Sequence, residues 1–188
     1  MKVVFLEPLG ISRESLEAQM QESLKNLKGS EKPEIVYYDD RKTDTETLIK
    51  RSQGADCVVL SNFKYGRDVM EACPDLKMIC VAFTGVDHVD VEYCRKRGIT
   101  VCNCAGYSTV AVADLVFGLV IALGRRIIAC DKAVGEGGTK NGLVGWELEG
   151  RIFGVVGTGA IGLRVARIAA AFGCRVLAYS RTKKQVEG

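Results

Sequence analysis

Three glycines near the C-terminal end of the chain have the spacing of a phosphate-binding loop. They occupy the first, third and sixth places of the segment Gly157-Thr158-Gly159-Ala160-Ile161-Gly162. In such a loop the first glycine makes a tight turn, the second lets the backbone approach a pyrophosphate, and the third allows a helix to pack on a strand. The apolar run 152–156 precedes the loop and the helical pattern of 160–172 follows it. The sequence therefore predicts a βαβ unit that binds a dinucleotide through its phosphates, at a helix N-terminus whose dipole favours negative charge.

The end of the following strand, 175–179, bears on which nicotinamide cofactor is bound. An Asp or Glu there, about 20 residues after the loop, binds the ribose 2′-OH of NAD. Ser180 and Arg181 occupy this place instead. Ser180 does not repel a 2′-phosphate, and Arg181 has the charge to pair with one. NAD and NADP both remain candidates, and this feature favours NADP.

Strand-like and helix-like segments alternate along the first hundred residues. Candidate strands are 3–6, 34–38, 57–60, 77–83 and 99–102, and candidate helices are 12–27, 45–51, 66–73 and 91–96. This alternation predicts a parallel sheet with helices on both faces. We therefore expect one α/β domain over 1–102 and the first part of a second over 103–188. The second domain is expected to open with one long helix, 109–134.

Composition excludes several classes of partner. The net charge is only +3 and no large cluster of Lys and Arg accompanies it, so neither a nucleic acid nor a membrane is expected as a partner. The longest apolar run, 115–123, is too short to span a bilayer. The N-terminal apolar run of 3–6 is too short for a signal peptide, so a cytoplasmic location is expected.

The eight cysteines contain no Cys-x-x-Cys pair, which argues against a metal site. In a reducing compartment we expect them to be unligated and free of disulfides. Five lie within or beside apolar runs, where a reduced cysteine packs as a small hydrophobic residue: Cys57, Cys80, Cys102, Cys104 and Cys174.

Three longer motifs occur in a fixed order. The first is TGVDHVD at 84–90, followed by GITVCN at 98–103; the second is GYSTVAVAD at 106–114; the third is ELEGRIFGVVG at 147–157. With these motifs the chain resembles the D-isomer-specific 2-hydroxyacid dehydrogenases, a group that includes phosphoglycerate dehydrogenases and glyoxylate and hydroxypyruvate reductases. The resemblance covers nearly the whole chain.

The resemblance implies a flavodoxin-like substrate domain followed by the first part of a Rossmann domain. It implies an oxidoreductase that acts on the CH–OH group of a small D-2-hydroxy acid, or reduces the 2-keto acid, with NAD or NADP. The loop holding Thr84, Gly85 and Val86 is similar to the one whose backbone N–H groups bind the substrate carboxylate. Ser108 and Val112 match positions that line the substrate and nicotinamide end of the cleft. For Val112, simple packing within a helix is an equal alternative.

No catalytic residue is matched within the chain. In the family the catalytic Arg, its Glu partner and the acid/base His follow later in the sequence than Gly188. His88, the only histidine, does not match the catalytic position. We therefore expect a truncated chain that is inactive by itself; the alternative is a non-catalytic nucleotide-binding or protein-binding module of the same architecture. A homo-oligomer is expected, formed through the strand edge after Tyr179 or through the helix that begins at Thr109.

Overall fold

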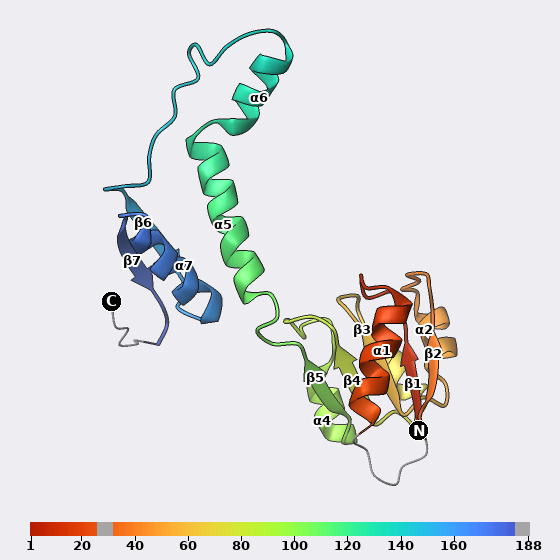
Figure 1. Ribbon diagram of the computed structural model, residues 1–188. Helices are drawn as coiled ribbons and strands as arrows, with labels where there is room; N and C mark the ends of the chain where they lie inside the picture. Colours follow the sequence, from red (N-terminus) through yellow and green to blue (C-terminus); the bar gives the residue numbers. More distant parts are fainter. Residues whose placement is uncertain (26–31, 183–188) are drawn as a thin grey trace. The chain divides into compact units, whose positions relative to one another are not determined.

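The computed structural model describes residues 1–25 and 32–182, and the chain divides into two compact units, residues 1–105 and 106–188 (Figure 1). The expected end of the first helix, near Leu27, lies outside the described residues. So do Lys183 and Lys184, which follow Arg181.

Unit 1 is built on a parallel five-stranded sheet with the order β2-β1-β3-β4-β5. This is the strand order of flavodoxin-like folds, and it confirms the predicted fold class. The strands are β1 (Lys2–Phe5), β2 (Glu34–Tyr37), β3 (Cys57–Leu60), β4 (Met78–Val81) and β5 (Thr100–Asn103). The helices are α1 (Arg13–Leu24), α2 (Thr45–Ser52), α3 (Arg67–Glu71) and α4 (Val91–Arg97).

Local sequence signals fix where these helices begin and end. The carboxylate of Asp44 accepts from the N–H of Thr47 at 2.8 Å and caps the N-terminus of α2. Asp90 caps α4 in the same way. Gly98 ends α4 in the left-handed conformation, with φ of 71°, which a residue with a side chain rarely adopts. The chain can therefore turn directly from α4 into β5.

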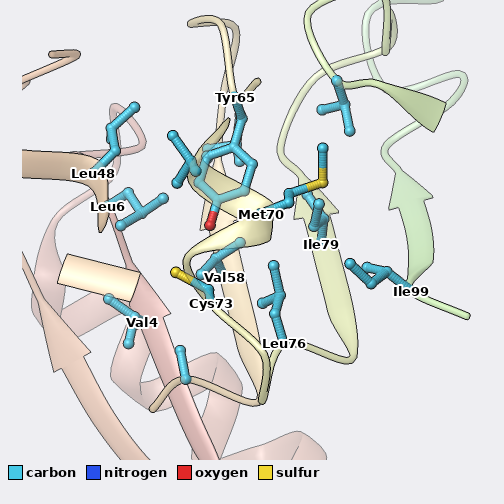
Figure 2. Packing of buried hydrophobic residues seen from close by; sticks show 14 of the residues in the cluster. Val4, Leu6, Leu48, Val58, Tyr65, Met70, Cys73, Leu76, Ile79 and Ile99 are labelled. Atoms are coloured by element: carbon cyan, nitrogen blue, oxygen red, sulfur yellow. The ribbon is translucent and has the colours of Figure 1, made fainter. Parts of the chain in front are cut away.

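The two faces of this sheet carry different cores. In the larger core, Leu48 of α2 and Met70 of α3 pack against Val58 and Ile79 of the sheet (Figure 2). Cys94 of α4 belongs to the same core. The smaller core lies on the opposite face, where Leu16 and Met20 of α1 pack against alternate strand residues such as Phe5 and Val59. Helices therefore cover both faces, as predicted for a parallel sheet.

Tyr65 is the largest fully buried side chain, and its hydroxyl donates to the hydroxyl of Ser52 at 2.9 Å within the larger core. Burial raises the pKa of Tyr65, so the phenol stays protonated and remains a donor. We expect Tyr65→Phe to lower the free energy of unfolding by about 1–3 kcal/mol, because the buried Ser52 hydroxyl loses its donor. Chemical denaturation of the two proteins measures this difference.

The double variant Tyr65→Phe/Ser52→Ala is expected to cost less than the sum of the single variants, since it removes both partners. Tyr93→Phe, at a partly exposed tyrosine, serves as the control and should change stability by less than about 0.5 kcal/mol. Equal costs for Tyr65→Phe and Tyr93→Phe would contradict the role of the buried pair.

Between residues 106 and 182, unit 2 holds two further strands and three helices. They are α5 (Thr109–Gly124), α6 (Ile127–Gly135), β6 (Ile152–Val156), α7 (Ala160–Ala171) and β7 (Arg175–Tyr179). The strands β6 and β7 are parallel and are joined through α7, which gives the predicted βαβ unit. Phe117 of α5 stacks on Phe153 of β6 and on Phe172 after α7, with ring centroids 5.6 and 5.3 Å apart. The aromatic contacts therefore fasten α5 to the βαβ unit.

The prediction of one long helix over 109–134 is wrong. The helix breaks at Arg126, whose φ of 52° is left-handed, and the chain continues as α6. At the break, the carbonyl of Gly124 accepts from the backbone N–H of Trp146 at 2.9 Å instead of continuing the helical ladder. The indole of Trp146 fills the space beside Gly124, where an added Cβ would lie 3.0 Å from the ring. The break thus depends on a residue far along the chain.

The expectation for the cysteines is partly wrong. Cys57 and Cys174 are buried, but Cys102 and Cys104 are exposed although they lie in and just after β5. In the described part of the chain, no helix is long and apolar enough to cross a membrane.

Candidate functional site

The phosphate loop joins β6 to α7, and the structure explains two of its three glycines, one by its backbone conformation and one by packing. Gly157 has a φ of 100°, in the left-handed region that favours glycine. A Cβ added to Gly162 would lie only 1.9 Å from the carbonyl oxygen of Gly157, so only glycine fits where the helix crosses the loop. A Cβ on Gly159 would meet nothing within 4 Å. Internal packing therefore does not require Gly159, and the open space beside it leaves room for a ligand to approach the backbone.

The same loop forms the N-terminus of α7. Gly159 occupies the N-cap position and no side chain caps the helix there, while the first turn contains no acidic residue. The first N–H groups of a helix have no partners within it, and together with the helix dipole they attract an anion. Loop and helix end thus fit the diphosphate of a dinucleotide.

Ser180 and Arg181 lie beside this loop. The backbone N–H of Gly157 donates to the carbonyl of Tyr179, the last residue of β7, at 2.7 Å. This bond places the residues that follow β7 directly next to the first glycine. Ser180 is half-buried and Arg181 is exposed, so the guanidinium is accessible to a ligand held on the loop. The structure therefore brings the predicted cofactor residues of the loop and of the strand end together.

The loop containing Thr84 leaves β4 at the carboxyl edge of the sheet in unit 1. The side-chain amide of Asn103 donates to the carbonyl of Thr84 at 2.6 Å, and the N–H of Cys104 donates to the carbonyl of Phe83 at 3.0 Å. These bonds tie the loop to the end of β5. Within the described residues, no backbone carbonyl accepts from the N–H of Gly85 or of Val86. Two successive N–H groups at a sheet edge can bind a carboxylate.

Ser108 is the N-cap of α5 and Val112 lies in the first turn of that helix, in unit 2. The carbonyl of Ser108 accepts from the N–H of Val112 at 2.9 Å, so the two residues lie one above the other on the helix. Val112 is 36% exposed, whereas Ala113 and Phe117 of the same helix are buried against α7 and β6. Packing of α5 thus rests on other residues, which weakens the simple packing explanation for Val112.

His88 belongs to the loop that follows Val86. Its carbonyl accepts from the N–H of Tyr65 at 2.9 Å, and its Nε2 is buried with no hydrogen-bond partner in the described part of the chain. His88 lines a hollow of about 830 Å³ together with Lys64 and Asp90. Across residues 1–25 and 32–182, no group of three or more His, Cys, Asp or Glu side chains is arranged to hold a metal ion.

A polar network at the same sheet edge was not predicted from the sequence. Glu7, directly after β1, is only 3% exposed. One of its oxygens accepts from the N–H of Ser61 at 2.7 Å, and the other lies 3.2 Å from the Nε of Arg41. Arg41 also donates to the side-chain oxygen of Asn62 at 2.6 Å. An acidic residue immediately after a buried strand was the available signal, because such a charge requires partners.

Gly162→Ala and Gly159→Ala separate the structural glycine from the ligand glycine. We expect Gly162→Ala to destabilise unit 2 by about 1–3 kcal/mol, because its Cβ would overlap a backbone oxygen that has little room to move. Gly159→Ala should leave stability nearly unchanged. Trp146, the only tryptophan, lies in unit 2, so its fluorescence during denaturation measures both effects. Equal destabilisation by both variants would contradict this division of roles.

A flavodoxin-like unit followed by a βαβ unit with a glycine-rich loop defines an α/β protein with two parallel sheets. Residues 4–187 match the model of the family described as D-isomer specific 2-hydroxyacid dehydrogenase, catalytic domain. The chain belongs to this family.

Three relatives illustrate the similarity. Glyoxylate reductase of Thermococcus litoralis is 37% identical over 161 residues, which are 80% of this chain and 49% of the relative. An acyclic imino acid reductase solved with NADPH and D-Arg matches 100% of this chain and 58% of its own, with 25% identity and a TM-score of 0.85. D-Lactate dehydrogenase from Aquifex aeolicus, solved with NAD and lactic acid, matches 98% and 53% respectively, with 28% identity and a TM-score of 0.77. The chain thus spans about half the length of the proteins that it matches.

Proposed function

We propose that this chain forms part of an oxidoreductase that acts on the CH–OH group of a small D-2-hydroxy acid, or reduces the 2-keto acid, with NAD or NADP. The observation that carries the proposal is Gly159, a glycine that internal packing does not require, at the centre of a phosphate loop that opens a helix. Family membership supports the substrate class, since glyoxylate reductase is among the relatives.

In this proposal one domain binds the substrate and the other binds the cofactor. The domain expected over 1–102 binds the substrate, whose carboxylate accepts from the backbone N–H groups of Thr84, Gly85 and Val86. The part over 103–188 binds the cofactor, with Ser108 facing the substrate and Val112 facing the nicotinamide. Backbone donors suit this task because they hold a carboxylate without adding a competing side-chain charge.

The proposed cofactor-binding residues belong to the phosphate loop and to the segment just after β7. The N–H groups of 157–162 hold the diphosphate, and Ser180 and Arg181 lie toward the adenosine ribose. When bound, the nicotinamide supplies the hydride acceptor or donor. Reduction of a keto acid also needs a proton donor and a cation that fixes the carboxylate. His88 lines the hollow with Lys64 and Asp90 and does not match the family's catalytic histidine. We therefore propose that the proton donor and the cation are residues that are not among these 188, and that this chain alone is inactive.

A non-catalytic module is the second candidate. The position of His88 favours this candidate, because the one histidine of the chain lies in the hollow with Lys64 and Asp90. A nucleotide-binding or protein-binding module would keep the phosphate loop without needing an acid/base group. Turnover of glyoxylate or hydroxypyruvate by the longest natural form that contains this sequence supports the enzyme. Nucleotide binding without turnover in that form supports the module.

Arg181→Ala tests the cofactor assignment. We expect NADPH to bind this chain more tightly than NADH, and the substitution to weaken NADPH binding about tenfold or more, because one charge-assisted bond to the 2′-phosphate is lost. NADH binding should change little. Calorimetry with both nucleotides measures the four affinities. Arg175→Ala is the matched control, since this exposed arginine stands at the opposite end of β7. Tighter binding of NADH by the unsubstituted chain would contradict the preference for NADP.

We expect this chain to form a homo-oligomer. The exposed apolar side chains of α5 and α6 support an interface at these helices rather than at the strand edge after Tyr179. The two helices form an apolar hollow of about 590 Å³. Leu123 and Ile128, which line it, are 76% and 78% exposed. Apolar side chains gathered on an exposed surface commonly mark a protein interface.

Eight free cysteines fit the reducing cytoplasm, where we propose that this protein acts.

Leu123→Asp and Ile128→Asp are expected to shift the chain from dimer to monomer, because burying an unpaired carboxylate costs several kcal/mol. Sedimentation velocity over a range of concentrations follows the change. Val144→Asp, at an 85% exposed valine outside these helices, is the control and should leave the dimer intact. A monomer at high concentration without any substitution would refute the oligomer.

A further inference from the structure

Three cysteines from three neighbouring strands share one face of the sheet in unit 1. Cys80 on β4 is in register with Cys102 on β5 and with Val59 on β3. Side chains in register on parallel strands point to the same face, and so do residues two apart on one strand. Cys57, two residues before Val59, therefore lies on the same face, which α1 covers near Leu16 and Met20 with apolar side chains.

The three thiols differ in accessibility. Cys57 is buried, Cys80 is half-buried and Cys102 is exposed. The sulfur atoms of Cys57 and Cys80 are 3.8 Å apart, which is hydrogen-bonding distance for thiols. Cys80 thus lies between a buried thiol that contacts it and an exposed thiol on the next strand.

The contact between the two sulfur atoms changes their acidity. Donation from the Cys57 thiol lowers the pKa of Cys80 to about 7, although partial burial acts in the opposite direction. The same contact and burial raise the pKa of Cys57. Cys102 and Asp56 are the other titratable groups that act on this pair, and both act on Cys57. A substantial part of Cys80 is therefore thiolate at neutral pH, and thiolate is the reactive form of cysteine.

We propose that Cys80 is a thiol-exchange site that reacts with low-molecular-weight disulfides and is then resolved by Cys102. The Cys80 thiolate attacks one sulfur of the small disulfide RSSR, forms a mixed disulfide, and releases one RS⁻, which takes up a proton. The Cys102 sulfur then loses its proton and attacks the Cys80 sulfur, which releases the second thiol. The balance is one RSSR and two cysteine thiols giving one protein disulfide and two RSH.

The strand register selects Cys102 over Cys57 as the second thiol. Neighbouring strands are about 4.8 Å apart, so the Cα atoms of the register pair Cys80 and Cys102 fall within the usual disulfide range of about 4.4–6.8 Å. Cys57 is offset from Cys80 by two residues along the strand. That offset adds about 6.6 Å along the strand and gives a diagonal of about 8 Å, which is too long without backbone movement. Cys57 can therefore stabilise the thiolate of Cys80 but not resolve its mixed disulfide.

The test is reaction of the full chain with glutathione disulfide, followed by intact-mass analysis and peptide mapping. The unsubstituted chain should form a Cys80–Cys102 disulfide without retained glutathione. Cys102→Ser should instead retain one glutathione on Cys80, and Cys80→Ser should form neither product. Cys104→Ser is the matched control, because Cys104 is an exposed cysteine two residues after Cys102; it should react as the unsubstituted chain does.

The pH dependence tests the role of Cys57. The reaction rate of Cys80 should rise with pH around a midpoint near 7. Cys57→Ala should move this midpoint toward the ordinary value of about 8.5 and slow the reaction at pH 7 about threefold, since the smaller thiolate fraction is partly offset by higher nucleophilicity. A Cys57–Cys80 disulfide, glutathione retained only at other cysteines, or an unchanged midpoint in Cys57→Ala would overturn the proposal.

Discussion

The parallel arrangement of the strands in unit 1 is the constraint on which its polar edge depends. Because all five strands run in one direction, the segments after β1, β3, β4 and β5 emerge at one edge of the sheet. Glu7, Asn62 and Thr84 lie in the segments after β1, β3 and β4, and Asn103 is the last residue of β5. Neighbouring strands are only about 4.8 Å apart, which brings residues at the ends of neighbouring strands within hydrogen-bonding reach. The helices and both cores serve to keep those strand ends in place.

In unit 2 a single close approach has the same importance. Gly162 passes so near the carbonyl of Gly157 that the helix, the loop and the strand form one rigid corner. The bond from Gly157 to Tyr179 then attaches the end of β7 to that corner. A loop shaped in this way offers its N–H groups to a ligand without rearrangement, which lowers the entropic cost of binding.

Features set by nearby residues could be predicted from the sequence, and features set by distant residues could not. The glycine loop, the alternation of strands and helices and the flavodoxin-like fold were predicted, since each depends on local patterns or on the resemblance. The break at Arg126 depends on Trp146, and the partners of Glu7 lie 34 and 54 residues away. The exposure of Cys102 depends on which helix covers which strand. None of these relations has a periodic signal along the chain.

The buried carboxylate of Glu7 also has a kinetic consequence for the segments it joins. If the segment of Glu7 moves away, Arg41 and Ser61 both lose a partner, and if the segment of Ser61 and Asn62 moves away, Glu7 and Arg41 both lose one. Their opening is therefore coupled, and the three should exchange their amide hydrogens as a single cooperative group rather than fray independently. Although these loops are separate along the chain, their amide hydrogens should exchange with solvent on the timescale of one compact structural element.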